Sequence, residues 1–110
     1  MKRILIIEDD PATVKGLEAS LREENYDVLV AMDGERGYQT AKRERADLII
    51  LDLILPKKNG MDVCRDLRAE GVGTPILMLT SRRNEIDEIL GLEIGADEYG
   101  SKVLFLVPVG

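Results

Sequence analysis

Carboxylate side chains follow two apolar runs of this sequence, and hydroxyl side chains follow a third run. The carboxylates are Glu8, Asp9 and Asp52, and the hydroxyls are Thr80 and Ser81. An unpaired carboxylate is costly to bury within an apolar strand, so Asp52 must be compensated or lie where its strand ends. Neighbouring carboxylates raise one another's pKa, and a hard cation removes that conflict. If these run ends are adjacent, the set predicts a Mg²⁺ site with Asp9 and Asp52 as ligands and Glu8 in the outer shell.

A structural role competes with a site for such acids, because acidic residues after a strand often cap the next helix. Asp10 directly precedes Pro11, which suits a first helical turn, so we interpret Asp10 as a helix cap. Acids after two separate runs, with a hydroxyl after a third, favour a site for the remaining acids. Lys57 and Lys58 are interpreted as part of a solvated loop, and Cys64 as a core residue.

The elements that must position these residues alternate along the chain. Short Ile, Leu and Val runs that are apolar on both faces predict buried parallel strands at residues 4–7, 28–32, 48–51 and 76–79. Apolar residues at helical spacing lie between them, namely Val14, Leu17 and Leu21, then Tyr38 and Ala41 within residues 35–44, then Val63, Cys64 and Leu67, then Ile86, Ile89 and Leu90. Repeated βαβ units of this kind predict an α/β fold with its functional groups at the carboxyl ends of the strands.

Composition restricts the class of protein further. The 110 residues fit one compact domain, and 15 basic against 21 acidic residues give a net charge of −6, which disfavours direct nucleic-acid binding by this chain. One cysteine and no histidine exclude an internal disulfide and the common zinc spacings, and they favour a cytoplasmic location. The apolar run near the start is too short for a signal peptide, and no run reaches bilayer length, so we expect neither export nor a membrane span.

Four motifs together carry a family resemblance. They are Glu8-Asp9, "DLILPKKNG" from Asp52, "PILMLTS" ending in Thr80-Ser81, and "GADEYGSK" ending at Lys102. Over residues 2–102 the sequence resembles the receiver domain of two-component response regulators. The resemblance implies a doubly wound, flavodoxin-like sheet of five parallel strands in the order 2-1-3-4-5.

The resemblance also implies roles for individual residues at the predicted metal site. Asp52 would be the phosphoacceptor that takes a phosphoryl group from the phosphohistidine of a sensor histidine kinase. Asp9 and Asp52 would hold Mg²⁺ together with the backbone carbonyl of Ile54, while Glu8 would act through bound water. Such chemistry needs positioning and charge compensation more than covalent assistance, which a metal and a lysine supply.

Residues beyond the metal site would complete the switch in this family. Thr80 would hydrogen-bond a phosphoryl oxygen, Lys102 would pair with Asp52 and then with the phosphoryl group, and Tyr99 matches the aromatic position that turns inward on activation. Ile54 and Arg82 occupy the two positions that tune hydrolysis of the phosphoaspartate. Because an apolar side chain and a long cation orient water poorly, we expect slow self-hydrolysis.

The sequence departs from the family after Lys102, where "VLFLVPVG" replaces the usual Pro-Phe and amphipathic fifth helix. An uncharged segment containing Pro108 cannot form that helix, so the fifth helix is predicted to be missing. We therefore divide the chain into a receiver domain at residues 1–102 and an atypical apolar tail at residues 103–110, which could lengthen the fifth strand. The sheet face left uncovered predicts self-association and impaired output.

Other classes of function share some of these features. A nucleotide or flavin binder shares the layout, but Glu8-Asp9-Asp10 repel phosphate where such a fold needs donors, and neither G-x-G-x-x-G nor a P-loop occurs. The alternative that stays open is a receiver-like interaction module that works without phosphorylation. The sequence of residues 48–102 resembles that of receiver domains that precede winged-helix DNA-binding domains. DNA binding would then belong to such a domain in a longer parent protein.

Overall fold

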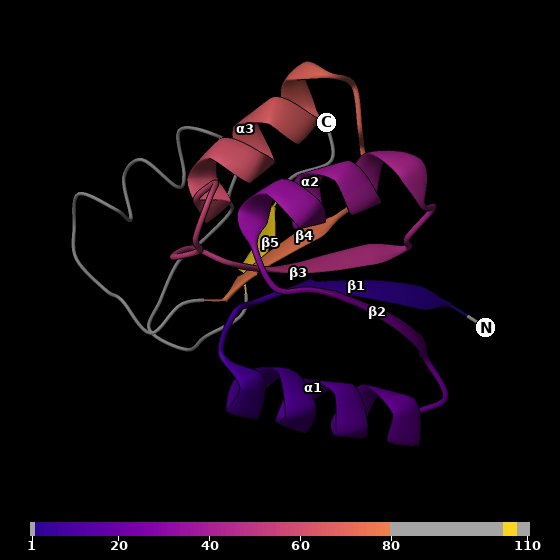
Figure 1. Ribbon diagram of the computed structural model, residues 1–110. Coiled ribbons are helices and arrows are strands. Elements are labelled where there is room, and N and C mark those ends of the chain that lie inside the picture. Colours follow the sequence, from indigo (N-terminus) through magenta and orange to yellow (C-terminus); the bar gives the residue numbers. More distant parts are fainter. Residues whose placement is uncertain (1, 80–104, 108–110) are drawn as a thin grey trace.

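The computed structural model describes residues 2–79 and 105–107, and it shows strands and helices in alternation (Figure 1). The elements in chain order are β1 (Arg3–Ile7), α1 (Pro11–Glu23), β2 (Asp27–Ala31), α2 (Gly34–Arg43), β3 (Leu48–Asp52), α3 (Gly60–Ala69), β4 (Ile76–Leu79) and β5 (Phe105–Val107). The four strands and three helices predicted up to residue 79 are thereby confirmed. The helix expected around Ile86 to Leu90 and the missing fifth helix fall outside the described residues.

The strands form one sheet in the order β2-β1-β3-β4-β5, as the resemblance implied. β1 pairs in parallel with both β2 and β3, and β3 pairs in parallel with β4. β5 differs from the expected parallel direction, because it runs antiparallel to β4, with Ile76 opposite Val107. The backbone of an apolar segment can form hydrogen bonds with the edge of β4 in either direction. The residue pattern alone therefore could not predict the direction of β5.

The core lies on both faces of the sheet because the strand residues alternate between the two faces. Leu5 and Leu51 belong to the larger cluster, which includes Val63 and Leu67 of α3, whereas Ile4 packs with residues of α1 on the other face. Figure 1 shows the corresponding layers, with α2 and α3 on one side of the sheet and α1 on the other. Each fully buried aliphatic side chain contributes about 1.5–3 kcal/mol to folding, so these clusters fix the sheet that carries the strand ends.

Two predictions about single residues in the helices are confirmed. The Asp10 side chain accepts a hydrogen bond from the backbone N–H of Thr13, at 3.2 Å, and so caps α1. Cys64 is fully buried in the larger cluster, and this burial raises the pKa of its thiol. Within the described residues, no helix combines the length and apolar character that a membrane crossing needs.

Candidate metal centre

The carboxylates of Glu8, Asp9 and Asp52 meet at one edge of the sheet, as the sequence predicted. Ile7 lies opposite Leu51 in the parallel pairing of β1 with β3, so the residues that follow come out side by side. One oxygen from each of the three carboxylates lies within 4.8 Å of the other two. Glu8 is only 2% exposed, Asp9 is exposed and Asp52 is intermediate, so the cluster runs from the interior to the surface.

Backbone hydrogen bonds fix the turn that carries the first two acids. The N–H of Glu8 donates to the carbonyl of Ala31 at 3.0 Å, which extends the pairing of β1 with β2 by one residue. The N–H of Asp9 donates to Oε2 of Glu8 at 3.0 Å. The turn therefore points Glu8 inward and leaves Asp9 at the mouth of the cluster.

The donor set suits a hard divalent cation. All three side chains offer carboxylate oxygen, which is the ligand type that Mg²⁺ prefers, and the gradient of exposure leaves room for water or a substrate oxygen. Three like charges at this separation are mutually unfavourable without a counter-charge. The chemistry of the cluster thus fits the Mg²⁺ expected from the sequence.

The loop at residues 53–59 joins Asp52, the last residue of β3, to α3. Its Leu53 and Leu55 are buried, whereas Ile54 is 48% exposed, so the loop alternates between core and surface directly after Asp52. Asn59 closes the loop by accepting a hydrogen bond from the N–H of Asp62 at 2.9 Å, which caps α3. A groove of about 300 Å³ runs along the loop and the first turns of α3 and is lined by Leu53, Ile54, Leu55, Asn59, Met61, Asp62 and Arg65.

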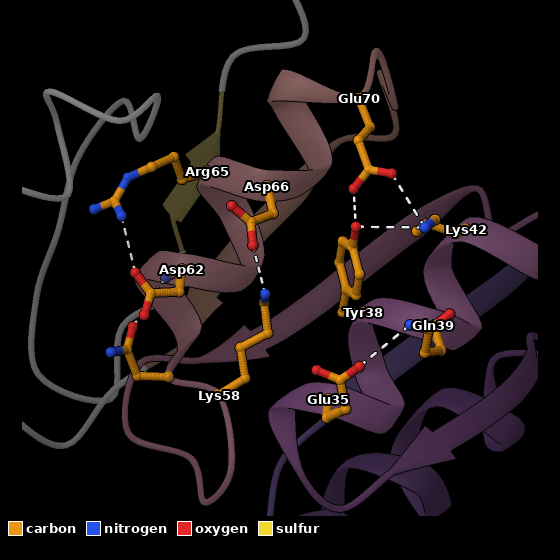
Figure 2. Close-up of polar contacts among 10 residues, drawn as sticks. Glu35, Tyr38, Gln39, Lys42, Lys58, Asp62, Arg65, Asp66 and Glu70 are labelled. Atoms are coloured by element: carbon orange, nitrogen blue, oxygen red, sulfur yellow. Dashed lines mark hydrogen bonds and ion pairs between the residues drawn. The ribbon is translucent and has the colours of Figure 1, made fainter.

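Neighbouring side chains cover most of the Lys58 side chain, so the interpretation of Lys57 and Lys58 as one solvated loop was wrong for this residue. Lys57 is exposed, but the Lys58 side chain is only 19% exposed. Figure 2 shows its ammonium reaching Asp66 of α3, with which it forms an ion pair, and it also lies 4.5 Å from the centroid of the Tyr38 ring. Sequence periodicity gives no signal for a contact between a loop and two helices.

The ion pair with Asp66 strengthens the preference of Lys58 for its charged form. The hydrogen bond to Asp66 is the main cause that raises the pKa of Lys58 above its ordinary value of 10.5, and burial acts in the opposite direction. A raised pKa in the folded state means that the stabilising contribution is fully present below pH 10.5 and is lost as the pH rises through the raised value.

A family model for the response regulator receiver domain matches residues 4–104, which is nearly the whole chain. The chain belongs to this family. The receiver-domain assignment thus confirms the resemblance drawn from the four motifs, and the placement of the acidic cluster at the ends of β1 and β3 agrees with it.

Relatives of this receiver domain include regulators and solved structures. The alkaline phosphatase synthesis transcriptional regulatory protein PhoP of Bacillus subtilis is 46% identical over 101 residues, which make up 92% of this chain but 42% of PhoP. The BeF3-activated receiver domain of RstA from Klebsiella pneumoniae is 41% identical, with a TM-score of 0.83 over 93% of this chain and 86% of that one. The chain therefore spans less than half the length of PhoP.

A third relative bears on the metal. The receiver domain of the sensor histidine kinase PA1611 from Pseudomonas aeruginosa, whose structure has a magnesium ion coordinated in the active-site cleft, is 34% identical. Its TM-score is 0.81, over 92% of this chain and 84% of that one. A receiver domain of this fold can thus hold magnesium in its active-site cleft.

The remaining predicted site residues of this receiver domain lie outside the described part of the chain. They are Thr80, Ser81, Arg82, Tyr99 and Lys102. Their roles stay predictions from the resemblance. The last described residue before them, Leu79, pairs with Asp52, so β4 lies directly beside the strand that carries Asp52.

Proposed function

We propose that this receiver domain accepts a phosphoryl group on Asp52 from the phosphohistidine of a sensor histidine kinase. A carboxylate oxygen of Asp52 would attack phosphorus as the P–N bond of the phosphohistidine breaks, and the leaving imidazole would keep its electron pair and take up a proton. The observation that carries the proposal is the meeting of the Glu8, Asp9 and Asp52 carboxylates within 4.8 Å at two adjacent strand ends.

The same proposal assigns the supporting residues. Asp9, Asp52 and the backbone carbonyl of Ile54 would hold Mg²⁺, and Glu8 would act through a bound water molecule. When bound, the ion supplies positive charge for the phosphoryl oxygens. Thr80 would then donate a hydrogen bond to one of these oxygens, and Lys102 would pair with them.

The proposed switch depends on the charge of the phosphoryl group. A dianionic group on Asp52 would draw Thr80 toward it, and Tyr99 would turn into the space that is vacated. The population of the switched state would therefore follow the phosphorylation of Asp52.

Mg²⁺-dependent phosphorylation by a small phosphodonor tests the proposed function. Intact mass spectrometry after incubation with acetyl phosphate is expected to show a gain of one phosphoryl group with Mg²⁺ and none with a chelator. A folded chain that melts cooperatively and gains no mass would instead favour the interaction module that works without phosphorylation. A chain that gains no mass and does not melt cooperatively would show that the domain is unfolded.

The lifetime of the phosphoryl group is expected to be long, because Ile54 and Arg82 are poor at orienting an attacking water. Ile54 is half-exposed beside Asp52, where a polar side chain could reach such a water. Replacing both residues, Ile54→Asn with Arg82→Glu, is therefore expected to speed loss of the phosphoryl group by about tenfold or more. The decay of phosphorylated mass after removal of acetyl phosphate measures this rate, and equal decay in the double variant and the wild type would contradict the prediction.

The wider setting is part of the proposal. PhoP is by name a transcriptional regulatory protein, so we infer a parent protein in which this receiver at residues 1–102 controls a DNA-binding domain in the cytoplasm. DNA contact would belong to that other domain, because this chain carries a net charge of −6. Self-association and a distinct apolar tail at residues 103–110 stay predictions from the sequence.

A further inference from the structure

The loop at residues 53–59 needs support from outside itself. It is neither helix nor strand. Two of its backbone hydrogen bonds are local: the N–H of Lys58 donates to the carbonyl of Pro56, and the N–H of Gly60 donates to the carbonyl of Leu53, both at 2.8 Å. Lys57 has a φ of 70°, in the left-handed region that a residue with a Cβ atom adopts only at a cost. Such a backbone persists only where surrounding contacts hold it.

The amino end of α2 holds one side of the loop. The N–H of Gly34 donates to the carbonyl of Pro56 at 3.1 Å. A Cβ atom added at Gly34 would lie 1.6 Å from the backbone oxygen of Lys58, so helix and loop touch at the level of their backbones. The contact supports the loop backbone on the side of α2, and the side chain of Lys58 makes its contacts with other partners.

The side chain of Lys58 then joins the loop to two helices (Figure 2). Its ammonium pairs with Asp66 of α3 and lies 4.5 Å from the ring centroid of Tyr38 of α2. The Tyr38 hydroxyl donates to Glu70, the residue that follows α3, and Lys42 pairs with the same carboxylate at 3.1 Å, so the ring is itself held between α2 and the end of α3. A charge-assisted hydrogen bond combined with a cation–π contact is a stronger tether than an exposed ion pair.

We propose that Lys58 is a positioning residue for the metal site. By tethering the loop to α2 and α3, Lys58 would limit the motion of the segment that carries Ile54, whose backbone carbonyl is the proposed backbone ligand of Mg²⁺. This inference rests on the proposed Mg²⁺ site. Without the tether the left-handed conformation at Lys57 can relax, and the carbonyl would spend part of its time turned away from the metal.

The Mg²⁺ affinity of Lys58→Met tests the proposal. Methionine keeps most of the aliphatic length and removes the charge, so the dissociation constant for Mg²⁺, measured by NMR titration of backbone amides, is expected to rise about tenfold. Lys57→Met is the matched control, because it removes the same charge from the neighbouring, exposed residue of the same loop. Its dissociation constant should match that of the wild type within about twofold.

Two further variants separate positioning from simple stability. Asp66→Asn removes the anionic partner from α3 and should weaken Mg²⁺ binding in the same direction, whereas Lys58→Arg keeps a cation and should restore most of the affinity. Urea unfolding without Mg²⁺ should be recorded for every variant. If Lys58→Met fails to fold, the Mg²⁺ affinity of Asp66→Asn relative to that of the wild type tests the positioning role of Lys58.

The outcomes distinguish this inference from the proposed function. Wild-type protein that binds Mg²⁺ while Lys58→Met and Asp66→Asn bind it equally well would overturn the positioning role alone, even if both variants are less stable. Wild-type protein that shows no saturable Mg²⁺ shift at Glu8, Asp9 or Asp52 would overturn the metal site and the inference together. Weaker binding in both variants, with Lys57→Met unchanged, would establish the role of Lys58.

Discussion

Replacing Asp52 with asparagine is expected to abolish phosphorylation by acetyl phosphate. Asparagine keeps the size of the side chain, but its amide is not a nucleophile toward phosphorus and is a poor ligand for Mg²⁺. Intact mass spectrometry should therefore show a gain of about one phosphoryl group per chain for the wild type and no gain for the variant. The free energy of unfolding without Mg²⁺ should not fall, because the substitution removes one of three crowded carboxylates.

Asp47→Asn provides the control for this experiment. Asp47 lies just before the amino end of β3, where its carboxylate accepts a hydrogen bond from the N–H of Arg3 at 2.8 Å. It is five residues from Asp52, roughly 16 Å along an extended strand, and an asparagine can still accept that hydrogen bond. Phosphorylation of Asp47→Asn should equal that of the wild type. A phosphoryl group found on Asp52→Asn would place the acceptor at another residue.

Gly60→Ala is expected to lower the free energy of unfolding by about 3 kcal/mol or more. A Cβ atom at Gly60 would lie 2.1 Å from the backbone oxygen of Asp52 and 2.8 Å from the Cα atom of Leu53. Both neighbours are backbone atoms, at the last residue of β3 and the first residue of the loop that follows, so no side-chain rotation can relieve the clash. Because the nearest clashing atom is the backbone oxygen of Asp52, the clash would displace Asp52, and Mg²⁺ binding should weaken as well.

Gly16→Ala is the matched substitution with the opposite expected sign. Gly16 is an exposed residue inside α1, and a Cβ atom there would meet nothing within 4 Å. Alanine in a helix is favoured over glycine by about 0.5–1 kcal/mol, so this variant should be more stable than the wild type. Urea unfolding of both variants measures the contrast. Equal stability of Gly60→Ala and the wild type would show that α3 does not pack against the end of β3 as described.

The sequence by itself determined the first four strands, the three described helices and the acids at the strand ends. Short continuous runs of Ile, Leu and Val indicate strands that are buried on both faces. Parallel strands that are neighbours bring their carboxyl ends to the same edge of the sheet. The pattern of residue types placed Glu8, Asp9 and Asp52 at strand ends, and the strand order that makes β1 and β3 neighbours was implied by the family resemblance. The roles of Thr80, Tyr99 and Lys102 came from the family resemblance and await a test.

Only the tertiary structure decided the features that depend on contacts between elements distant in the chain. The direction of β5 depends on which way an apolar segment meets the edge of β4, and the need for glycine at residue 60 depends on how closely α3 approaches β3. The placement of the Lys58 side chain also depends on contacts between distant elements. Its side-chain length and charge are compatible with solvent, and only the positions of Tyr38 and Asp66 on two helices draw it inward, because local periodicity does not encode such contacts.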